Sequence, residues 1–320
     1  MRTVTASKTV IDTLGIRIEC NSVYEQRELL NNLLQYISTN HSFYVDYKDT
    51  IINPMTGIFN REYLIYGSSK LLASITTMSF QVGKDRKQTV YFIKIVWAGI
   101  KKYNEFDKLS LVCILSICSW LNSLGIILRI CELDVAVDIK SFSENLLVLP
   151  INRVPNVSYY TPNEEQPFTE TIYIEKINLK RKDHLSLRSY LYSKHEKENL
   201  DNEIITRFEV ALRTAFFTNK STSFYELLTS IYKALDRYAI LHFQNLNEKN
   251  YVIQDYNNII NSDIKNKSRK LNSLDLESYR LYPDTKFIEE FISTVLFTKD
   301  FHSNMNDEWF VQTVLSEFNN

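Results

Sequence analysis

Glycine and proline are scarce in this chain, with 6 of each among 320 residues. Linker-rich arrays depend on these two residues, so one large or two ordinary compact domains are expected. We find no internal repeat and no heptad pattern, which argues against a solenoid and a coiled coil. Long apolar runs are also missing, since the most apolar stretch, residues 111–121, contains two serines and is too short to span a bilayer. The first 20 residues lack the apolar segment of a signal peptide, and a cytoplasmic location is expected.

Charge of one sign is not in excess. The chain has 37 Lys and Arg against 38 Asp and Glu, a formal net charge of −1. Nucleic-acid-binding proteins usually carry a basic excess, so any DNA site here must be a local patch. The 4 cysteines lack metal-site spacing and most lie in apolar surroundings; they are Cys20, Cys113, Cys118 and Cys131. They are predicted to be buried free thiols in a reducing compartment.

Aromatic residues are plentiful, at 13% of the chain with 20 Tyr and 18 Phe. Aromatic side chains favour strands and can stack on nucleic-acid bases. AT-rich coding, which favours Tyr and Phe codons, is the simpler explanation for most of this excess.

Apolar periodicity predicts a series of helices and strands. In the first half these are strand 10–19, helix 24–37, strands 62–77 and 88–96 as a hairpin, helix 105–124 ended by Gly125, and strand 131–139. In the second half they are strands 169–177, 185–194 and 204–214 and helices 223–243 and 287–299, with a loop at 245–270. The strand–helix–strand order is typical of a sandwich of helices on a sheet. A boundary near residue 220 is predicted, between an α+β region at 1–220 and a mainly helical region at 221–320.

The strand at residues 131–139 is the most informative segment. Its apolar residues are Cys131, Leu133, Val135, Val137 and Ile139, and they alternate with Glu132, Asp134, Ala136 and Asp138. Because strand side chains repeat with period two, one face packs on a core and the other carries three carboxylates. Clustered carboxylates repel one another unless a cation lies between them. Either a divalent metal or a Lys or Arg partner would fill that role.

A second strand, at residues 206–213, also has one apolar and one charged face. Its charged face contains Arg207, Glu209 and Arg213. If the two strands are neighbours, Asp134, Asp138 and Glu209 converge, and such an oxygen-only ligand set suits Mg²⁺ or Mn²⁺. The alternative is a solvated sheet face with cross-strand Asp–Arg pairs.

Tyrosine and basic residues accumulate between residues 168 and 213. One face of a predicted strand carries Arg188, Tyr190, Tyr192 and Lys194. A tyrosine beside a metal and basic groups suits phosphoryl transfer, because a cation favours the phenolate and stabilises charge on the departing oxygen. Lys and Arg would hold the remaining phosphate oxygens. In a chain with 20 tyrosines, packing is the commoner role of any single one.

Four short motifs, in order, resemble those of the rolling-circle replication initiators called the replication initiation factor or Rep_trans group. These are Glu132-Leu-Asp-Val-Ala-Val-Asp138, Thr171-Ile-Tyr-Ile174, Tyr192-Ser-Lys194 followed by Glu196 or Glu198, and Arg207-Phe-Glu209. The segment Ile11-Asp-Thr-Leu14 is similar to the usual start of the family. The chain departs from the family at Glu175-Lys176, where Gly-Ser is usual, and at Ser193, where Asp is frequent. The 5 histidines form no His-hydrophobic-His metal motif.

The resemblance implies an α+β fold with an antiparallel-rich central sheet and packed helices. It implies an initiator that nicks a double-strand origin, with Tyr173 attacking the scissile phosphate and Tyr192 as the second candidate. The products would be a 5′-phosphotyrosyl link and a free 3′-OH. Asp134, Asp138 and Glu209 would hold Mg²⁺ or Mn²⁺, and Lys194 and Arg207 would contact phosphate or orient the acids.

The expected partners are origin DNA, both duplex and single-stranded, a host helicase and a second copy of the chain, with no membrane. The main rival is a catalytically degenerate protein that uses the same fold for sequence-specific DNA binding, which the missing Gly-Ser favours. A third hypothesis is a structural protein of a mobile element with a fortuitous charged strand.

Overall fold

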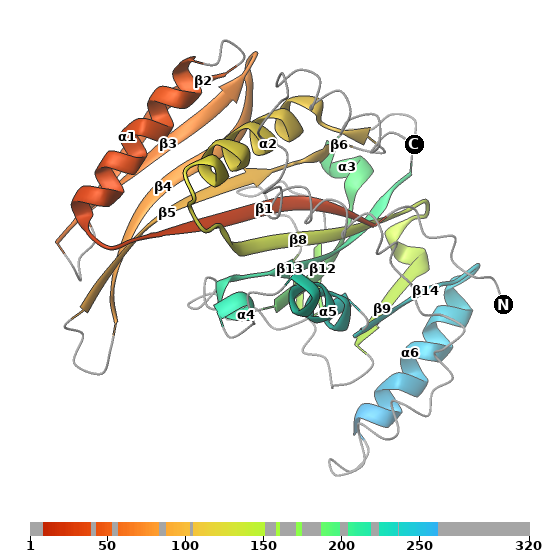
Figure 1. Cartoon of the computed structure of the whole chain (residues 1–320). Coiled ribbons are helices and arrows are strands. Elements are labelled where there is room, and N and C mark those ends of the chain that lie inside the picture. Colours follow the sequence, from red (N-terminus) through yellow and green to blue (C-terminus); the bar gives the residue numbers. More distant parts are fainter. Residues whose placement is uncertain are drawn as a thin grey trace. The chain divides into compact units, whose positions relative to one another are not determined.

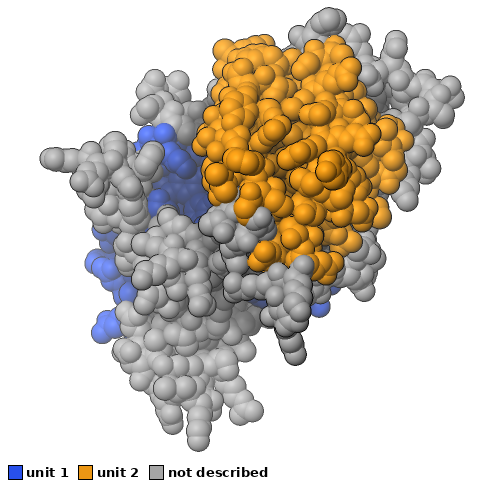
Figure 2. All heavy atoms as spheres, turned by 90° about the vertical axis from the view of Figure 1, so that its left-hand side faces the viewer, with its two compact units in different colours: residues 1–10, 134–289 blue, residues 11–133, 290–320 orange. Residues whose placement is uncertain are grey.

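The computed structural model describes residues 9–39, 43–52, 57–82, 88–102, 105–150, 158–160, 171–174, 187–198, 204–218, 224–235 and 237–261. The chain forms two compact units, residues 1–10 with 134–289 (unit 1) and residues 11–133 with 290–320 (unit 2), coloured separately in Figure 2. The predicted division near residue 220 falls inside unit 1. Because compactness does not define function, the predicted catalytic and C-terminal regions stay a prediction.

Unit 2 is an antiparallel sheet with helices on one face. In chain order its elements are β1 (Thr9–Cys20), α1 (Val23–Thr39), β2 (Tyr44–Ile52), β3 (Phe59–Gly67), β4 (Lys70–Val82), β5 (Gln88–Ala98), the short β6 (Lys101–Lys102) and β7 (Glu105–Phe106), and α2 (Lys108–Ser123). The strands lie in the order β1-β5-β4-β3-β2, and all four neighbouring pairs are antiparallel. Figure 1 shows α1 and α2 on the same face of these strands. Their contact includes the stacked rings of Tyr36 and Trp120, with centroids 4.9 Å apart.

Unit 1 begins with the second part of β8 (Arg129–Ile139), whose first five residues belong to unit 2. The following elements are η1 (Ser143–Asn145), β9 (Leu146–Pro150), β10 (Ser158–Tyr160), β11 (Thr171–Tyr173), β12 (Leu187–Ser193), α3 (Lys194–Glu198), β13 (Thr206–Leu212), α4 (Thr214–Thr218), α5 (Phe224–Leu235), β14 (Tyr238–His242) and α6 (Leu246–Asn261). The strand order is β10-β11-β12-β13-β8, and β9 pairs with β14 in a separate two-stranded sheet. The prediction of an α+β fold with an antiparallel-rich sheet is confirmed.

The alternating pattern of β8 and β13 produces the core of unit 1. Val135 and Val137 of β8 and Phe208 and Val210 of β13 line one side of a small apolar cavity. The other lining residues come from α5 and β14; they are Leu235, Tyr238 and Ile240. The rings of Phe208 and Tyr238 meet edge to face, with centroids 5.3 Å apart. The apolar faces predicted from the sequence are therefore packing faces, and the charged residues of both strands lie on the opposite side.

Three local predictions are corrected. Predicted strand 62–77 is two strands, β3 and β4, joined by a turn at Ser68, which has a positive φ of 54°. Predicted helix 223–243 ends at Leu235 and continues as β14, because Tyr238–His242 pairs with β9, a partner almost 90 residues away that sequence periodicity does not reveal. Within predicted loop 245–270, residues 246–261 form α6, whose first turn is capped by Asn245 Oδ1 accepting from Glu248 N at 2.9 Å.

The predicted mainly helical region 221–320 thus contains a strand. Its predicted helix 287–299 lies outside the described residues, as do the basic runs 180–182 and 265–270. The prediction that all four cysteines are buried free thiols is confirmed. Within the described part of the chain, no helix is long and apolar enough to cross a membrane.

Candidate functional site

The four motifs come together on neighbouring strands, which lie in the order β11-β12-β13-β8. In the antiparallel register of β12 and β13, Tyr190 lies opposite Glu209 and Tyr192 lies opposite Arg207. Directly opposite residues of an antiparallel pair project to the same side. The tyrosines of β12 and the charged residues of β13 therefore share one face of the sheet.

Asp138 of β8 is held by two buried cations. Arg207 Nε donates to Asp138 Oδ1 at 2.6 Å and Nη2 donates to Oδ2 at 2.9 Å, a bidentate arrangement. Lys194 Nζ lies 3.9 Å from Asp138 Oδ2. Arg207 and Lys194 are each 1% exposed and Asp138 is 3% exposed. Cross-strand Asp–Arg pairing does occur, but the expectation that it belongs to a solvated face is wrong.

The other acids of β8 also have basic partners. Arg213, which follows β13, donates from Nη1 to Asp134 Oδ1 and from Nη2 to Asp134 Oδ2, the latter at 3.2 Å. Glu132, in unit 2, accepts from Lys94 Nζ of β5 at 2.8 Å. The cation that the clustered carboxylates need is thus supplied, for all three, by Lys or Arg.

Glu209 is a carboxylate surrounded by tyrosines. Its Oε1 accepts from the Tyr190 hydroxyl and its Oε2 accepts from the Tyr192 hydroxyl at 3.3 Å. The two rings stack, with centroids 6.0 Å apart. Lys197 of α3 is exposed and places Nζ 4.5 Å from the centroid of the Tyr192 ring. One buried carboxylate, two phenols and a solvent-facing ammonium group thus form a continuous cluster.

This environment holds Tyr190 in its neutral form. Burial, the charges of Glu209 and Asp134, and the hydrogen bond to Glu209 raise the pKa of Tyr190 far above its ordinary value. An unfolded tyrosine ionises near pH 10. The stabilisation from Tyr190 is therefore fully present below about pH 10 and is lost as the pH rises further, because the unfolded state then releases a proton that the folded state keeps.

We expect Tyr190→Phe to flatten the alkaline fall in stability. Above about pH 10, the free energy of unfolding of the wild type should fall more steeply than that of Tyr190→Phe, by up to about 1.4 kcal/mol per pH unit. Urea denaturation from pH 8 to pH 11 measures both slopes. Tyr24→Phe, at a tyrosine that is 77% exposed, is the control and should keep the wild-type slope. Equal slopes in the wild type and Tyr190→Phe would contradict the assignment.

The predicted metal ligands share the face but not a common centre. Asp134 contacts Arg213, Asp138 contacts Arg207 and Lys194, and Glu209 contacts Tyr190 and Tyr192; these contacts occupy the carboxylate oxygens. Among the described residues, no group of three or more His, Cys, Asp or Glu side chains could hold a metal ion. The donor set as arranged does not fit Mg²⁺ or Mn²⁺, so metal binding stays a prediction and no step is derived from it.

Tyr173, the first candidate nucleophile, is described for its backbone alone. It ends β11 and lies opposite Tyr190 in the β11–β12 register. Its backbone therefore borders the Glu209 cluster, on the strand next to Tyr190 and Tyr192.

The sequence placed Tyr190 and Arg213 on the charged strand faces without assigning either a role, and it did not single out Lys197. Tyr190 and Arg213 were visible as alternate residues on the charged faces of their strands, at the spacing that also selects Tyr192 and Arg207. Lys197 had no such signal, because its place over the Tyr192 ring depends on the turn into α3.

No family model and no curated protein matches the sequence. Among solved structures, the chain is similar to the rolling circle replication initiator protein from Geobacillus stearothermophilus, with 13% sequence identity, a TM-score of 0.38, and coverage of 91% of this chain and 98% of that chain. At that identity and TM-score, the likeness assigns no activity to this chain.

Proposed function

We propose that the chain is a replication initiator that cleaves one DNA strand at an origin by tyrosine transesterification. The observation that carries the proposal is the Glu209 cluster, in which two tyrosine hydroxyls donate to one buried carboxylate. Support also comes from the four motifs of the resemblance, which lie on adjacent strands of the sheet.

In the proposed reaction, a tyrosine oxygen forms a bond to phosphorus while the bond from phosphorus to the 3′ oxygen breaks. The phenol proton passes to a nearby base, for which Glu209 is the candidate because it already accepts from tyrosine hydroxyls. The departing oxygen takes up a proton and becomes a free 3′-OH, and the 5′ phosphate stays on the protein. The reverse reaction reseals the strand.

Basic groups near the cluster have different proposed roles. Lys197 is exposed beside the Tyr192 ring, so we assign it the phosphate contact. Arg207 and Lys194 are almost fully buried against Asp138, which suits orientation of that acid better than contact with DNA. The resemblance predicted that Lys194 and Arg207 either contact phosphate or orient the acids. In this proposal they orient Asp138, and Lys197 contacts phosphate.

Two tyrosines are candidates for the attacking residue. Tyr173 matches the motif and borders the cluster through its backbone. Tyr192 has the described contact with Glu209 and lies next to Lys197. Tyr190 is the weakest candidate, because burial and two neighbouring carboxylates raise its pKa and disfavour the phenolate.

The test is covalent capture of DNA. The purified protein is incubated with supercoiled plasmid carrying the neighbouring genomic DNA and with Mn²⁺, and protein-linked open circles are scored. We expect adduct with the wild type, none with Tyr173→Phe, and slower formation with Tyr192→Phe. Adduct with Tyr173→Phe but not with Tyr192→Phe would exchange their roles.

The rival function is sequence-specific DNA binding without cleavage, and it too has a supporting observation. The acids of β8 are paired with Lys or Arg, as expected of a structural rather than a reactive charged face. Under that hypothesis, the protein retains origin DNA in a filter assay and yields no adduct. Adduct formation at the wild-type rate by Tyr173→Phe, by Tyr192→Phe and by Tyr190→Phe would remove the tyrosines of this region from the reaction.

A further inference from the structure

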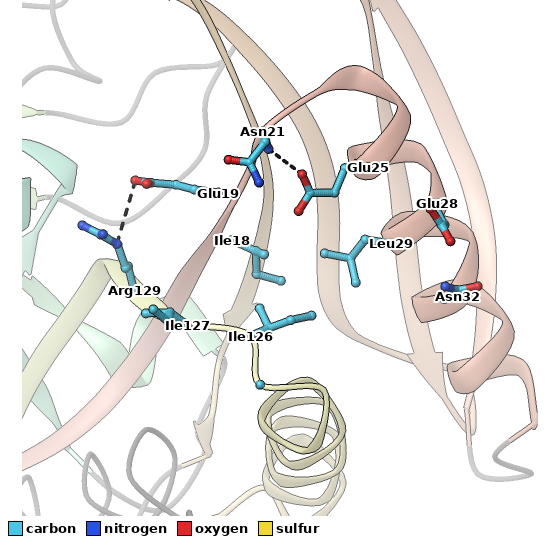
Figure 3. A pocket seen from close by; sticks show the side chains of 11 residues that line it. Ile18, Glu19, Asn21, Glu25, Glu28, Leu29, Asn32, Ile126, Ile127 and Arg129 are labelled. Carbon is cyan, nitrogen blue, oxygen red and sulfur yellow. Dashed lines mark hydrogen bonds and ion pairs between the residues drawn. The ribbon is translucent and has the colours of Figure 1, made fainter.

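Unit 2 contains a groove that the proposed reaction does not use. It has a volume of about 500 Å³ and lies between β1, the first half of α1 and the segment that connects α2 to β8 (Figure 3). The residues that line it are Ile18, Glu19, Asn21, Glu25, Glu28, Leu29, Asn32, Gly125, Ile126, Ile127 and Arg129.

The inner part of the groove is apolar. Figure 3 shows Ile18 of β1, Leu29 of α1 and Ile126 of the connecting segment facing the same space. Ile127 also lines the groove and is 73% exposed, which makes it one of the most exposed large apolar side chains of the described chain. A concave surface lined by several aliphatic side chains is typical of a binding site.

The rim of the groove is acidic. Glu19, Glu25 and Glu28 line it against one basic residue, Arg129, so three negative charges meet one positive charge and the lining has a formal charge of −2. Arg129 Nε lies 3.9 Å from Glu19 Oε1, and Arg17 Nη2 lies 2.7 Å from the same oxygen, so the charge of Glu19 is compensated and the remaining negative charge of the rim comes from Glu25 and Glu28. Glu25 Oε2 accepts from Asn21 N at 2.7 Å, and Glu25 and Glu28 are both exposed.

The charge selects the kind of occupant. A phosphate-bearing ligand such as DNA is repelled by this rim. Lys and Arg side chains fit it, because their charged ends can meet the carboxylates while their aliphatic stems cover the apolar lining. We propose that this groove docks a partner protein through a segment in which an aliphatic side chain stands beside Lys or Arg. The inference goes beyond the proposed DNA cleavage and does not depend on it.

The test uses the full-length chain and a fluorescein-labelled 15-residue helical peptide of Leu and Lys, with a peptide of Leu and Glu as its counterpart. Fluorescence anisotropy at physiological salt is expected to show binding of the Lys peptide and at least about tenfold weaker binding of the Glu peptide. Glu28→Lys and Ile127→Ser should each weaken binding of the Lys peptide by about tenfold, through the rim and the apolar lining respectively.

A matched variant distinguishes binding in the groove from non-specific attraction of the Lys peptide to acidic residues elsewhere on the surface. Asp46→Lys makes the same charge change as Glu28→Lys at an exposed position of β2 that does not line the groove, and it should alter binding less than about twofold. The proposal is overturned if the Lys peptide does not bind, or if Glu28→Lys binds it as tightly as the wild type. It is also overturned if Asp46→Lys weakens binding of the peptide as much as Glu28→Lys does. DNA cleavage should be unaffected by Glu28→Lys and Ile127→Ser, so failure here is distinguishable from failure of the proposed function.

Discussion

Asp138→Ala is expected to lower the free energy of unfolding by about 3–5 kcal/mol, because it removes the carboxylate that two buried cations contact. Arg207 binds Asp138 through two hydrogen bonds and Lys194 lies 3.9 Å from it, and both cations are 1% exposed. A charge that loses its partner in such a place keeps its desolvation cost without the compensating attraction. Urea denaturation at pH 7, monitored by circular dichroism, measures the change.

Glu62→Ala provides the comparison for this prediction. Glu62 pairs with Lys48 at 3.0 Å, but the Lys48 side chain is half exposed and solvent screens the attraction. We expect a loss of no more than about 1 kcal/mol from this variant. If Asp138→Ala costs no more than Glu62→Ala, the Asp138 cluster is not a stabilising element of unit 1 and its burial needs another explanation.

Glu209→Gln is expected to slow covalent adduct formation by about 10²–10⁴-fold, the usual contribution of a positioned acid–base group. The substitution preserves the size of the side chain and removes the negative charge that two tyrosine hydroxyls face. Because Glu209 is buried, affinity for origin DNA should change little. Single-turnover cleavage with the protein in excess over origin DNA measures the rate, and a filter assay measures binding.

Glu248→Gln is the matched control for the second prediction. Glu248 lies on α6, outside the four motifs, and is exposed, so this variant is expected to cleave at the wild-type rate. A wild-type rate in Glu209→Gln would remove Glu209 from the chemistry. Weaker DNA binding together with slower cleavage in Glu209→Gln would indicate a structural role instead.

The faces of β8 and β13 were predictable because alternation is a local property. Val135 and Val137 face the core, while Asp134 and Asp138 lie with the charged residues of β13, as period two requires. The long helices α1 and α2 were predictable for the same reason, since their apolar spacing and end signals are contained in their own sequences. Gly125, with φ of 72°, follows α2 as expected of a residue that tolerates the left-handed region.

β14 and α6 were not predictable from local patterns. β14 depends on pairing with β9, and the run before it is apolar enough to continue a helix. α6 contains many Asn residues, so its sequence is typical of a loop, although Asn245 caps its first turn. In both cases, contacts that are distant in sequence or specific in geometry outweigh intrinsic propensity.

The sequence by itself determined which residues share a strand face, and so placed the acids, the tyrosines and Arg207 on compatible sides. The tertiary structure alone decided which cation meets which acid: Arg207 and Lys194 meet Asp138, Arg213 meets Asp134, and Glu209 meets tyrosines. The physical reason is that alternation is fixed by the geometry of each strand, whereas partners depend on strand order and register between segments about 70 residues apart. Burial, which no local pattern reports, makes this face a closed cluster of paired charges and not the solvated face that the sequence left open as an alternative.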